Sequence, residues 1–221
     1  MQYHPVHLDL RGRPCVVIGG GEVGGAKVAS LLEAEARVTV VSPVLVPALA
    51  ALADTHEIVH HPRPYRPGDL AGAALAYVAV ADPAVQAAVA AEASAAGVFV
   101  NVVDVPALCT FIAPAVVRRG PVVVAVSTGG ASPALARRLR QDLEARIGAE
   151  YGLAATILAK VRPLVRASHT DAADRSRTFA RLVDGPLLEA LRARDADSVD
   201  AILRDTVGDG ASLAALGVAL S

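Results

Sequence analysis

The chain has 221 residues, of which 53% are hydrophobic, and a formal net charge of −1. This length and composition exclude a disordered chain and predict a sizeable core in one large domain with a smaller one attached. No apolar run reaches the roughly 18 residues of a membrane helix, and the first residues do not resemble a signal peptide, so we expect a cytosolic protein without membrane contact.

Charge is distributed unevenly along the chain. Residues 112–182, here called the basic segment, hold twelve Lys or Arg and five Asp or Glu, a net charge of +7, whereas residues 1–111 carry −4. The basic segment indicates an anionic partner, although solvated helix faces with ordinary ion pairs are an alternative explanation. Aromatic residues make up only 3% of the chain, which argues against the stacking platforms of nucleic-acid binders. We therefore expect no nucleic-acid partner.

Apolar runs in the first half of the chain have the length and residue types of buried strands: Cys15–Ile18, Val38–Val41, Ile58–His60, Leu75–Val80 and Val98–Val103. Ala-rich segments of helical length, such as Val23–Ala34 and Pro83–Ala96, separate them. Asp82 is expected to cap the second of these helices, and Gly97 to end it. The runs are apolar on both faces, which is typical of a parallel sheet covered by helices on both sides. The pattern predicts a doubly wound α/β domain over residues 1–112.

Gly19, Gly21 and Gly24 form the pattern GxGxxG between the first predicted strand and the helix that follows. In a dinucleotide site, the first glycine permits a tight turn, the second lets a pyrophosphate approach, and the third allows close packing of helix on strand. The amino end of the helix adds free N–H groups for phosphate oxygens. A tight turn without a ligand is the alternative. We predict a Rossmann-type parallel sheet with a nucleotide site.

The second predicted strand is followed by Ser42, where dinucleotide-binding domains usually place the acidic residue that holds the adenosine ribose. A serine can share a hydrogen bond with the ribose but carries no charge, so it does not repel a 2′-phosphate. No arginine stands beside it to attract one. The sequence therefore favours NAD over NADP by a narrow margin.

Asp104 follows the fifth predicted strand, and Pro106 then interrupts further strand pairing. Ligands of open parallel sheets lie beyond the carboxyl ends of the strands, so this carboxylate can accept a proton from a substrate bound there. Aspartate at the end of a strand is also a common turn residue that bonds its own backbone. Position alone does not separate the two interpretations.

A further strand is predicted at Val122–Ser127, followed by a glycine turn and a helix that begins at Ser132 and Pro133. From Tyr151 onward the sequence shows helical periodicity and no strand pattern, so we expect a small helical domain over residues 151–221. The histidines lack the spacing of metal ligands, and the two cysteines form no CxxC pair. We therefore expect no metal site.

Three stretches together resemble the dehydrogenase and chelatase module of the siroheme synthase family: CVVIGGGEVGGAKVASLLEAEARVTVVSP, VAVADPAVQ and NVVDVPALCTFIAPAVVRRGPVVVAVSTGGASPALARRLR. The resemblance extends from about Leu8 to Leu143, with a looser helical match to about Asp205. It implies an NAD-binding Rossmann domain (residues 1–112), a central homodimerisation segment (113–150) and a helical domain (151–221). It also implies NAD⁺-dependent oxidation of precorrin-2 to sirohydrochlorin, with Fe²⁺ insertion in bifunctional members.

The resemblance implies roles for single residues as well. Glu22 and Val23 match the family's pyrophosphate-loop contacts, and Pro43 and Val44 match its contacts after the second strand. Asp104 matches the aspartate assigned to both chemical steps. Since residues 1–221 include no methyltransferase domain, we expect the stand-alone form of the module.

Precorrin-2 bears several carboxylates, which guanidinium groups bind well. The basic segment supplies the first candidates for these contacts: Arg118, Arg119, Arg137 and Arg138. Thr128 is a further candidate and stands where some members have a serine that can be phosphorylated. Fe²⁺ is expected as a substrate of the chelatase step. Two alternatives stay open, namely a dehydrogenase without chelatase activity and a non-catalytic NAD-sensing module.

Overall fold

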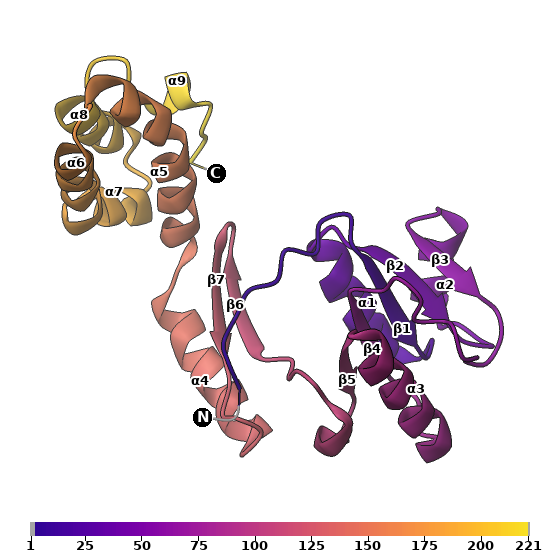
Figure 1. Cartoon of the computed structure of the whole chain (residues 1–221). Coiled ribbons are helices and arrows are strands. Elements are labelled where there is room, and N and C mark those ends of the chain that lie inside the picture. The colour runs from indigo at the N-terminus through magenta and orange to yellow at the C-terminus, as the bar shows by residue number, and fades with distance from the viewer. Residues whose placement is uncertain (1–2, 221) are drawn as a thin grey trace. The chain divides into compact units, whose positions relative to one another are not determined.

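A computed structural model describes residues 3–220 of the chain (Figure 1). The chain divides into two compact units, of which unit 1 ends at Ala113 and unit 2 begins at Pro114. Unit 1 holds the parallel sheet, and unit 2 holds a β-hairpin and most of the helices.

Unit 1 is built on a five-stranded parallel sheet with the strand order β3-β2-β1-β4-β5. Its strands are β1 (Pro14–Ile18), β2 (Arg37–Val41), β3 (Ile58–His61), β4 (Leu75–Val78) and β5 (Phe99–Val102). In register, Ile18 of β1 lies beside Val41 on one side and Val78 on the other, and Val78 lies beside Val102. The strand order reverses direction between β1 and β4, which places a ligand crevice at their carboxyl ends. The predicted α/β fold is confirmed.

Helices cover both faces of this sheet, as the strand composition predicts. Alternate residues of a strand point to opposite faces, so Cys15 and Val17 join one core with α1 (Glu22–Glu33) and α2 (Pro47–Asp54). Val16 and Ile18 join the other core with α3 (Pro83–Ala96). A short 3₁₀ helix, η1 (Pro106–Leu108), follows β5.

The ends of α3 follow the sequence prediction. The Asp82 carboxylate accepts hydrogen bonds from the N–H groups of Ala84 (2.8 Å) and Val85 (3.4 Å), and Pro83 occupies the first turn. Gly97 ends the helix with φ +66°, a left-handed conformation that glycine adopts without strain.

Unit 2 begins with an antiparallel hairpin of β6 (Ala115–Arg119) and β7 (Val122–Val126). The sequence pattern predicts the second of these strands but not the first. A two-residue turn joins them, with Gly120 at φ +54°. Helix α4 (Pro133–Arg146) follows and packs on the hairpin. The Ser132 hydroxyl caps α4 by accepting a hydrogen bond from the Leu135 N–H at 3.2 Å, as the sequence predicts.

The rest of unit 2 is helical: α5 (Ala149–Ser168), α6 (Ala172–Asp184), α7 (Leu187–Ala193), α8 (Ala196–Val207) and α9 (Leu213–Leu216). These helices share one core, in which Ile157, Leu182, Leu187 and Leu203 are almost completely buried. Glu150 joins α5 to α7 by accepting hydrogen bonds from the guanidinium of Arg192 at 2.9 and 3.1 Å. Over residues 3–220, no helix combines the length and the apolar character that a bilayer crossing demands.

Candidate functional site

Two of the predicted glycines are sterically required in the loop after β1. Gly19 has φ +116°, and a Cβ there would lie 2.5 Å from the carbonyl oxygen of Ala79, which follows β4. A Cβ on Gly24 would collide with the Gly19 carbonyl oxygen. Gly20, which the sequence analysis did not single out, is equally tight, because its Cβ would meet the Val44 carbonyl oxygen. The loop therefore lies in close contact with the backbone that follows β2 and with the backbone that follows β4.

Gly21 differs from these three glycines because it faces open space. No atom lies within 4 Å of a Cβ built on it, and its φ of −83° is accessible to any residue. Gly21 is the N-cap of α1, and no side chain caps this helix end. The N–H groups of the first turn lack helical partners, and the positive end of the helix dipole lies at this open helix start. This arrangement fits a pyrophosphate.

The turn after β2 presents apolar surface next to this loop. The side chain of Val44 is 76% exposed, and Pro43 beside it is also exposed. Ser42 is buried, and its hydroxyl donates to the Val44 carbonyl oxygen at 2.8 Å. The ring nitrogen Nε2 of His60 lies 2.9 Å from the Ser42 carbonyl oxygen. The Ser42 hydroxyl thus shapes the turn, and because its proton is already donated, it can take part in a ribose contact only as an acceptor.

At the start of α1, Glu22 and Val23 are both exposed. The loop after β1 and the turn after β2 are connected through backbone, since the Val46 N–H donates to the Gly20 carbonyl oxygen at 2.9 Å. The structure therefore brings all of the predicted cofactor-binding residues to one end of the sheet: Gly19, Gly21, Glu22, Val23, Gly24, Ser42, Pro43 and Val44.

Asp104 lies at the same end of the sheet, just beyond β5. Because β1, β4 and β5 run parallel and in register, it is separated from the Gly19 loop by two strand spacings, or about 10 Å. Asp104 is exposed and has φ +61°, a left-handed conformation that is uncommon outside glycine. Within residues 3–220, its carboxylate accepts no hydrogen bond. The carboxylate is therefore available to a ligand, and the Val105 N–H closes the turn by donating to the Val102 carbonyl oxygen at 3.1 Å.

The basic candidates lie in unit 2 and have different surroundings. The Arg119 side chain is hydrogen-bonded within unit 2. Its Nε donates to the Ile147 carbonyl oxygen at 2.9 Å, and its Nη2 donates to the Glu144 carbonyl oxygen at 3.1 Å. Arg138 pairs with Asp142, one turn further along α4, at 2.9 Å. Arg118 and Arg137 are exposed.

Thr128 shapes the loop before α4. Its hydroxyl accepts a hydrogen bond from the Ser132 N–H at 3.0 Å and lies 3.1 Å from the Ser132 carbonyl oxygen, to which it donates. Thr128 is partly buried in this position. The hydroxyl is therefore engaged with the residue that caps α4.

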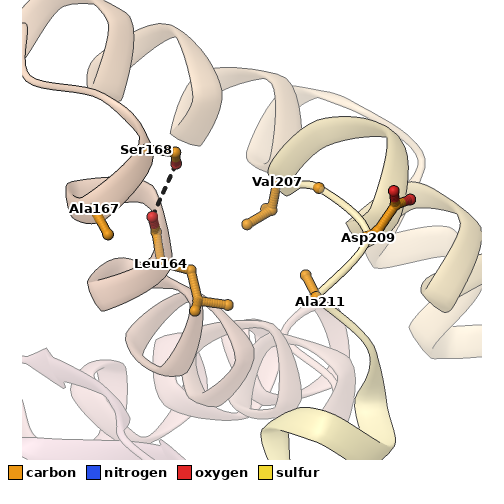
Figure 2. A pocket seen from close by; sticks show the side chains of 8 residues that line it. Leu164, Ala167, Ser168, Val207, Asp209 and Ala211 are labelled. Carbon is orange, nitrogen blue, oxygen red and sulfur yellow. Dashed lines mark hydrogen bonds between the residues drawn. The ribbon is translucent and has the colours of Figure 1, made fainter.

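A hollow of about 350 Å³ lies in unit 2 between the end of α5 and the segment after α8, as Figure 2 shows. Its lining is mainly apolar, and Asp209 is its ionisable side chain. The Ser168 hydroxyl beside it donates to the Leu164 carbonyl oxygen at 2.9 Å. None of the described residues that line this hollow has a positively charged side chain, so it is a poor site for an anionic ligand. In the described part of the chain, no three His, Cys, Asp or Glu side chains gather into a cluster that could hold a metal ion.

Three family models match consecutive parts of the chain. Residues 6–115 match a model described as "Putative NAD(P)-binding". Residues 119–146 match "Sirohaem biosynthesis protein central", and residues 150–206 match "Sirohaem synthase dimerisation region". The first model covers the sheet and the site residues of unit 1, and the other two cover α4 and most of the helices after it.

Curated relatives point to the same family. The chain is 44% identical over 194 residues to the siroheme synthase of Nitrosomonas europaea, covering 87% of this chain and 41% of that protein. It is 40% identical over 217 residues to that of Ectopseudomonas mendocina, covering 98% of this chain and 46% of that protein. The chain thus spans less than half the length of these curated relatives.

A solved structure supports the fold. The chain named SirC, precorrin-2 dehydrogenase, superimposes with a TM-score of 0.75 at 24% sequence identity, covering 90% of this chain and 98% of that one. At this identity the likeness concerns the fold. The three consecutive family models and the relatives at 40% identity or more establish that the chain belongs to the siroheme synthase family.

Proposed function

We propose that the chain binds NAD⁺ and oxidises precorrin-2 to sirohydrochlorin. The observation that carries this proposal is the exposed Asp104 carboxylate, which has no hydrogen-bond partner among residues 3–220 and lies at the same sheet end as the open N-terminus of α1. The names of the relatives support it, since the curated ones are siroheme synthases and the solved one is a precorrin-2 dehydrogenase.

The proposed cofactor-binding residues form two groups, one for the pyrophosphate and one for the adenosine end of NAD⁺. Gly19, Gly21 and Gly24, with the N–H groups of Glu22 and Val23, are proposed to hold the pyrophosphate. The turn formed by Ser42, Pro43 and Val44 is proposed to hold the adenosine end, where the exposed apolar surface suits an adenine ring. When bound, NAD⁺ supplies the hydride acceptor.

Asp104 is proposed as the catalytic base. Its carboxylate accepts a proton from the macrocycle as the substrate loses a hydride, and no hydrogen bond within residues 3–220 ties it to its own backbone. In a chelatase step the same carboxylate would accept pyrrole protons that Fe²⁺ displaces. We propose this chelatase activity in addition to the dehydrogenase activity. The alternative is a dehydrogenase that stops at sirohydrochlorin.

Carboxylates of the substrate are proposed to meet guanidinium groups of the basic segment. Arg118, Arg137 and Arg138 are the proposed donors, because each is exposed. Arg119 and Thr128 are proposed as weaker contributors to substrate binding. Hydrogen bonds within unit 2 already orient both side chains, so only their remaining donors and acceptors could reach the substrate.

We propose a cytosolic homodimer with the division predicted from the sequence, namely residues 1–112, 113–150 and 151–221. The match of residues 150–206 to a dimerisation region supports the dimer. The proposed contact region therefore extends from the central segment, residues 113–150, into the helical domain.

An anaerobic assay with NAD⁺ and enzymatically prepared precorrin-2 tests the function. The proposal expects sirohydrochlorin and NADH in equal amounts, and then faster metal insertion with Fe²⁺ than in the absence of protein. Oxidation without faster insertion would leave a dehydrogenase alone. Absence of oxidation, with NAD⁺ still bound, would favour the NAD-sensing module instead.

A further inference from the structure

The segment that follows Asp104 folds back along the open edge of β5. β5 is the last strand of the sheet, with β4 on one side only. The Val103 N–H, just after β5, points toward β4 and donates to the Val78 carbonyl oxygen at 3.0 Å. The N–H groups of Val100 and Val102 point the other way, and an edge strand normally leaves such groups to solvent. Here the returning segment binds them.

Two consecutive side chains of this segment make the contacts. Thr110 pairs with Val100, because its Oγ1 accepts from the Val100 N–H and its own N–H donates to the Val100 carbonyl oxygen, both at 2.8 Å. Cys109 pairs with Val102, whose N–H donates to Sγ at 3.2 Å. The thiol proton has two acceptors within reach, the carbonyl oxygens of Val102 at 3.3 Å and Val105 at 3.4 Å.

The thiol of Cys109 therefore contacts both ends of the turn that carries Asp104. We call Val102–Val105 the Asp104 turn. A residue other than glycine with positive φ stores strain and persists only where its surroundings hold it. The Asp104 side chain makes no hydrogen bond of its own among residues 3–220, so the backbone on either side fixes its position. Cys109 is the side chain that grips this backbone at both sides.

We propose that Cys109 is a positioning residue, whose thiol holds the Asp104 turn so that the carboxylate faces the ligand crevice. The inference rests on the proposed function, because positioning matters only if Asp104 acts on the substrate. Thr110 anchors the same segment one step farther from the turn, at Val100. It provides a matched comparison within the same stretch of chain.

Substitutions at position 109 separate hydrogen bonding from packing. Cys109→Ser keeps a donor and an acceptor, whereas Cys109→Ala removes both and Cys109→Val fills the space without them. We expect Cys109→Ala and Cys109→Val to lower kcat for precorrin-2 oxidation by about tenfold to a hundredfold, the scale of an ångström-sized misplacement. Cys109→Ser should restore most of the rate. The KM for NAD⁺ should not change, and Thr110→Val should lower kcat by less.

Hydrogen–deuterium exchange of the same variants provides a readout that does not depend on activity. Peptides that span residues 99–111 should exchange faster in Cys109→Ala and Cys109→Val than in the wild type and Cys109→Ser, while peptides of α1 stay unchanged. Unchanged exchange in Cys109→Ala would overturn the proposal. Faster exchange with a wild-type kcat would also overturn it, because loosening the turn would then have no effect on catalysis by Asp104. A wild-type protein that oxidises no precorrin-2 would overturn the proposed function and the catalytic part of this inference, whereas exchange would still show whether the thiol holds the turn.

Discussion

Gly19 and Gly21 are two positions apart in the same loop, yet they meet opposite surroundings. At Gly19 the left-handed φ and the Ala79 carbonyl oxygen, 2.5 Å from a built Cβ, both exclude a larger residue. At Gly21 the φ is ordinary and the space is open. The first glycine is therefore required by the fold, and the second is required only if a ligand approaches.

Alanine substitutions distinguish these roles. Gly21→Ala should leave the thermal unfolding midpoint almost unchanged and weaken NAD⁺ binding by about tenfold or more, because its Cβ would occupy the path of the pyrophosphate. Gly19→Ala should lower the unfolding midpoint, because the backbone of Ala79 has to move. Calorimetry of NAD⁺ binding and of unfolding measures both. Gly25→Ala serves as the control, since its Cβ meets only Leu49 at 3.8 Å. Equal NAD⁺ affinity in Gly21→Ala and Gly25→Ala would argue against the proposed site.

The sequence patterns indicate candidate site residues but do not assign all of their contacts. They leave Asp104 divided between a catalytic carboxylate and a turn residue bonded to its own backbone, and the structure shows a carboxylate without a hydrogen bond inside residues 3–220. They also do not distinguish the arginines of the basic segment, whereas Arg119 is bound to two carbonyl oxygens near the end of α4. Such contacts link residues far apart in the chain and leave no local pattern in the sequence.

At the scale of elements, one carboxylate organises the connection between β3 and β4. Glu92 of α3 accepts hydrogen bonds from the Tyr65 hydroxyl and from the N–H groups of Gly68 (3.1 Å) and Leu70 (2.9 Å). Although burial acts to raise the pKa of Glu92, these three donors outweigh it and hold the pKa below its ordinary value of 4.5. The folded state is therefore stabilised by the ionised form.

This shift predicts a pH dependence with a definite sign. A lowered pKa stabilises the folded protein above the unfolded-state pKa, and the contribution is lost as pH falls through the folded-state pKa. Glu92→Gln should cost about 1–2 kcal/mol of unfolding free energy at pH 7, and the difference from the wild type should shrink as pH falls below 4.5. Urea unfolding of both proteins at pH 7 and at a pH below 4.5 measures this difference. Tyr65→Phe, which removes one of the three donors, should cost less; a Glu92→Gln deficit that grows in acid would contradict this account.

The predicted elements agree with the structure where local signals are strong. Helix α3 has the predicted bounds because Asp82, Pro83 and Gly97 mark both ends. Strand β6 was missed because its residues, Ala115–Arg119, end in two arginines, and only pairing with β7 makes it a strand. Helix α2 was not predicted individually, although it is rich in alanine and Pro47 suits its first turn.

At the scale of the whole molecule, the division into a sheet unit and a helical unit agrees with the alternation of strand and helix patterns followed by helical periodicity alone. A charge difference accompanies it, because the basic segment lies almost entirely in unit 2. The oligomeric state is a property of the surface as a whole, so composition and periodicity do not indicate it, and only the likeness of residues 150–206 to a dimerisation region does.

The proposed dimer makes a direct prediction about mass. Light scattering after size-exclusion chromatography should give twice the 22.5 kDa of one chain at micromolar concentration, without dependence on NAD⁺. A mass of 22.5 kDa at all concentrations tested would exclude the dimer. It would leave the proposed cofactor site unaffected, because the proposed cofactor-binding residues and Asp104 all lie in unit 1.

The most direct measurement compares the wild type with Asp104→Asn for NADH formation from NAD⁺ and precorrin-2, with NAD⁺ affinity measured in parallel. Asparagine tolerates the left-handed conformation at this position, so the turn should persist while the base is lost. The account predicts an unchanged NAD⁺ affinity and a kcat lower by about 10²–10⁴-fold. A variant that oxidises precorrin-2 at the wild-type rate would show that this carboxylate is not the base.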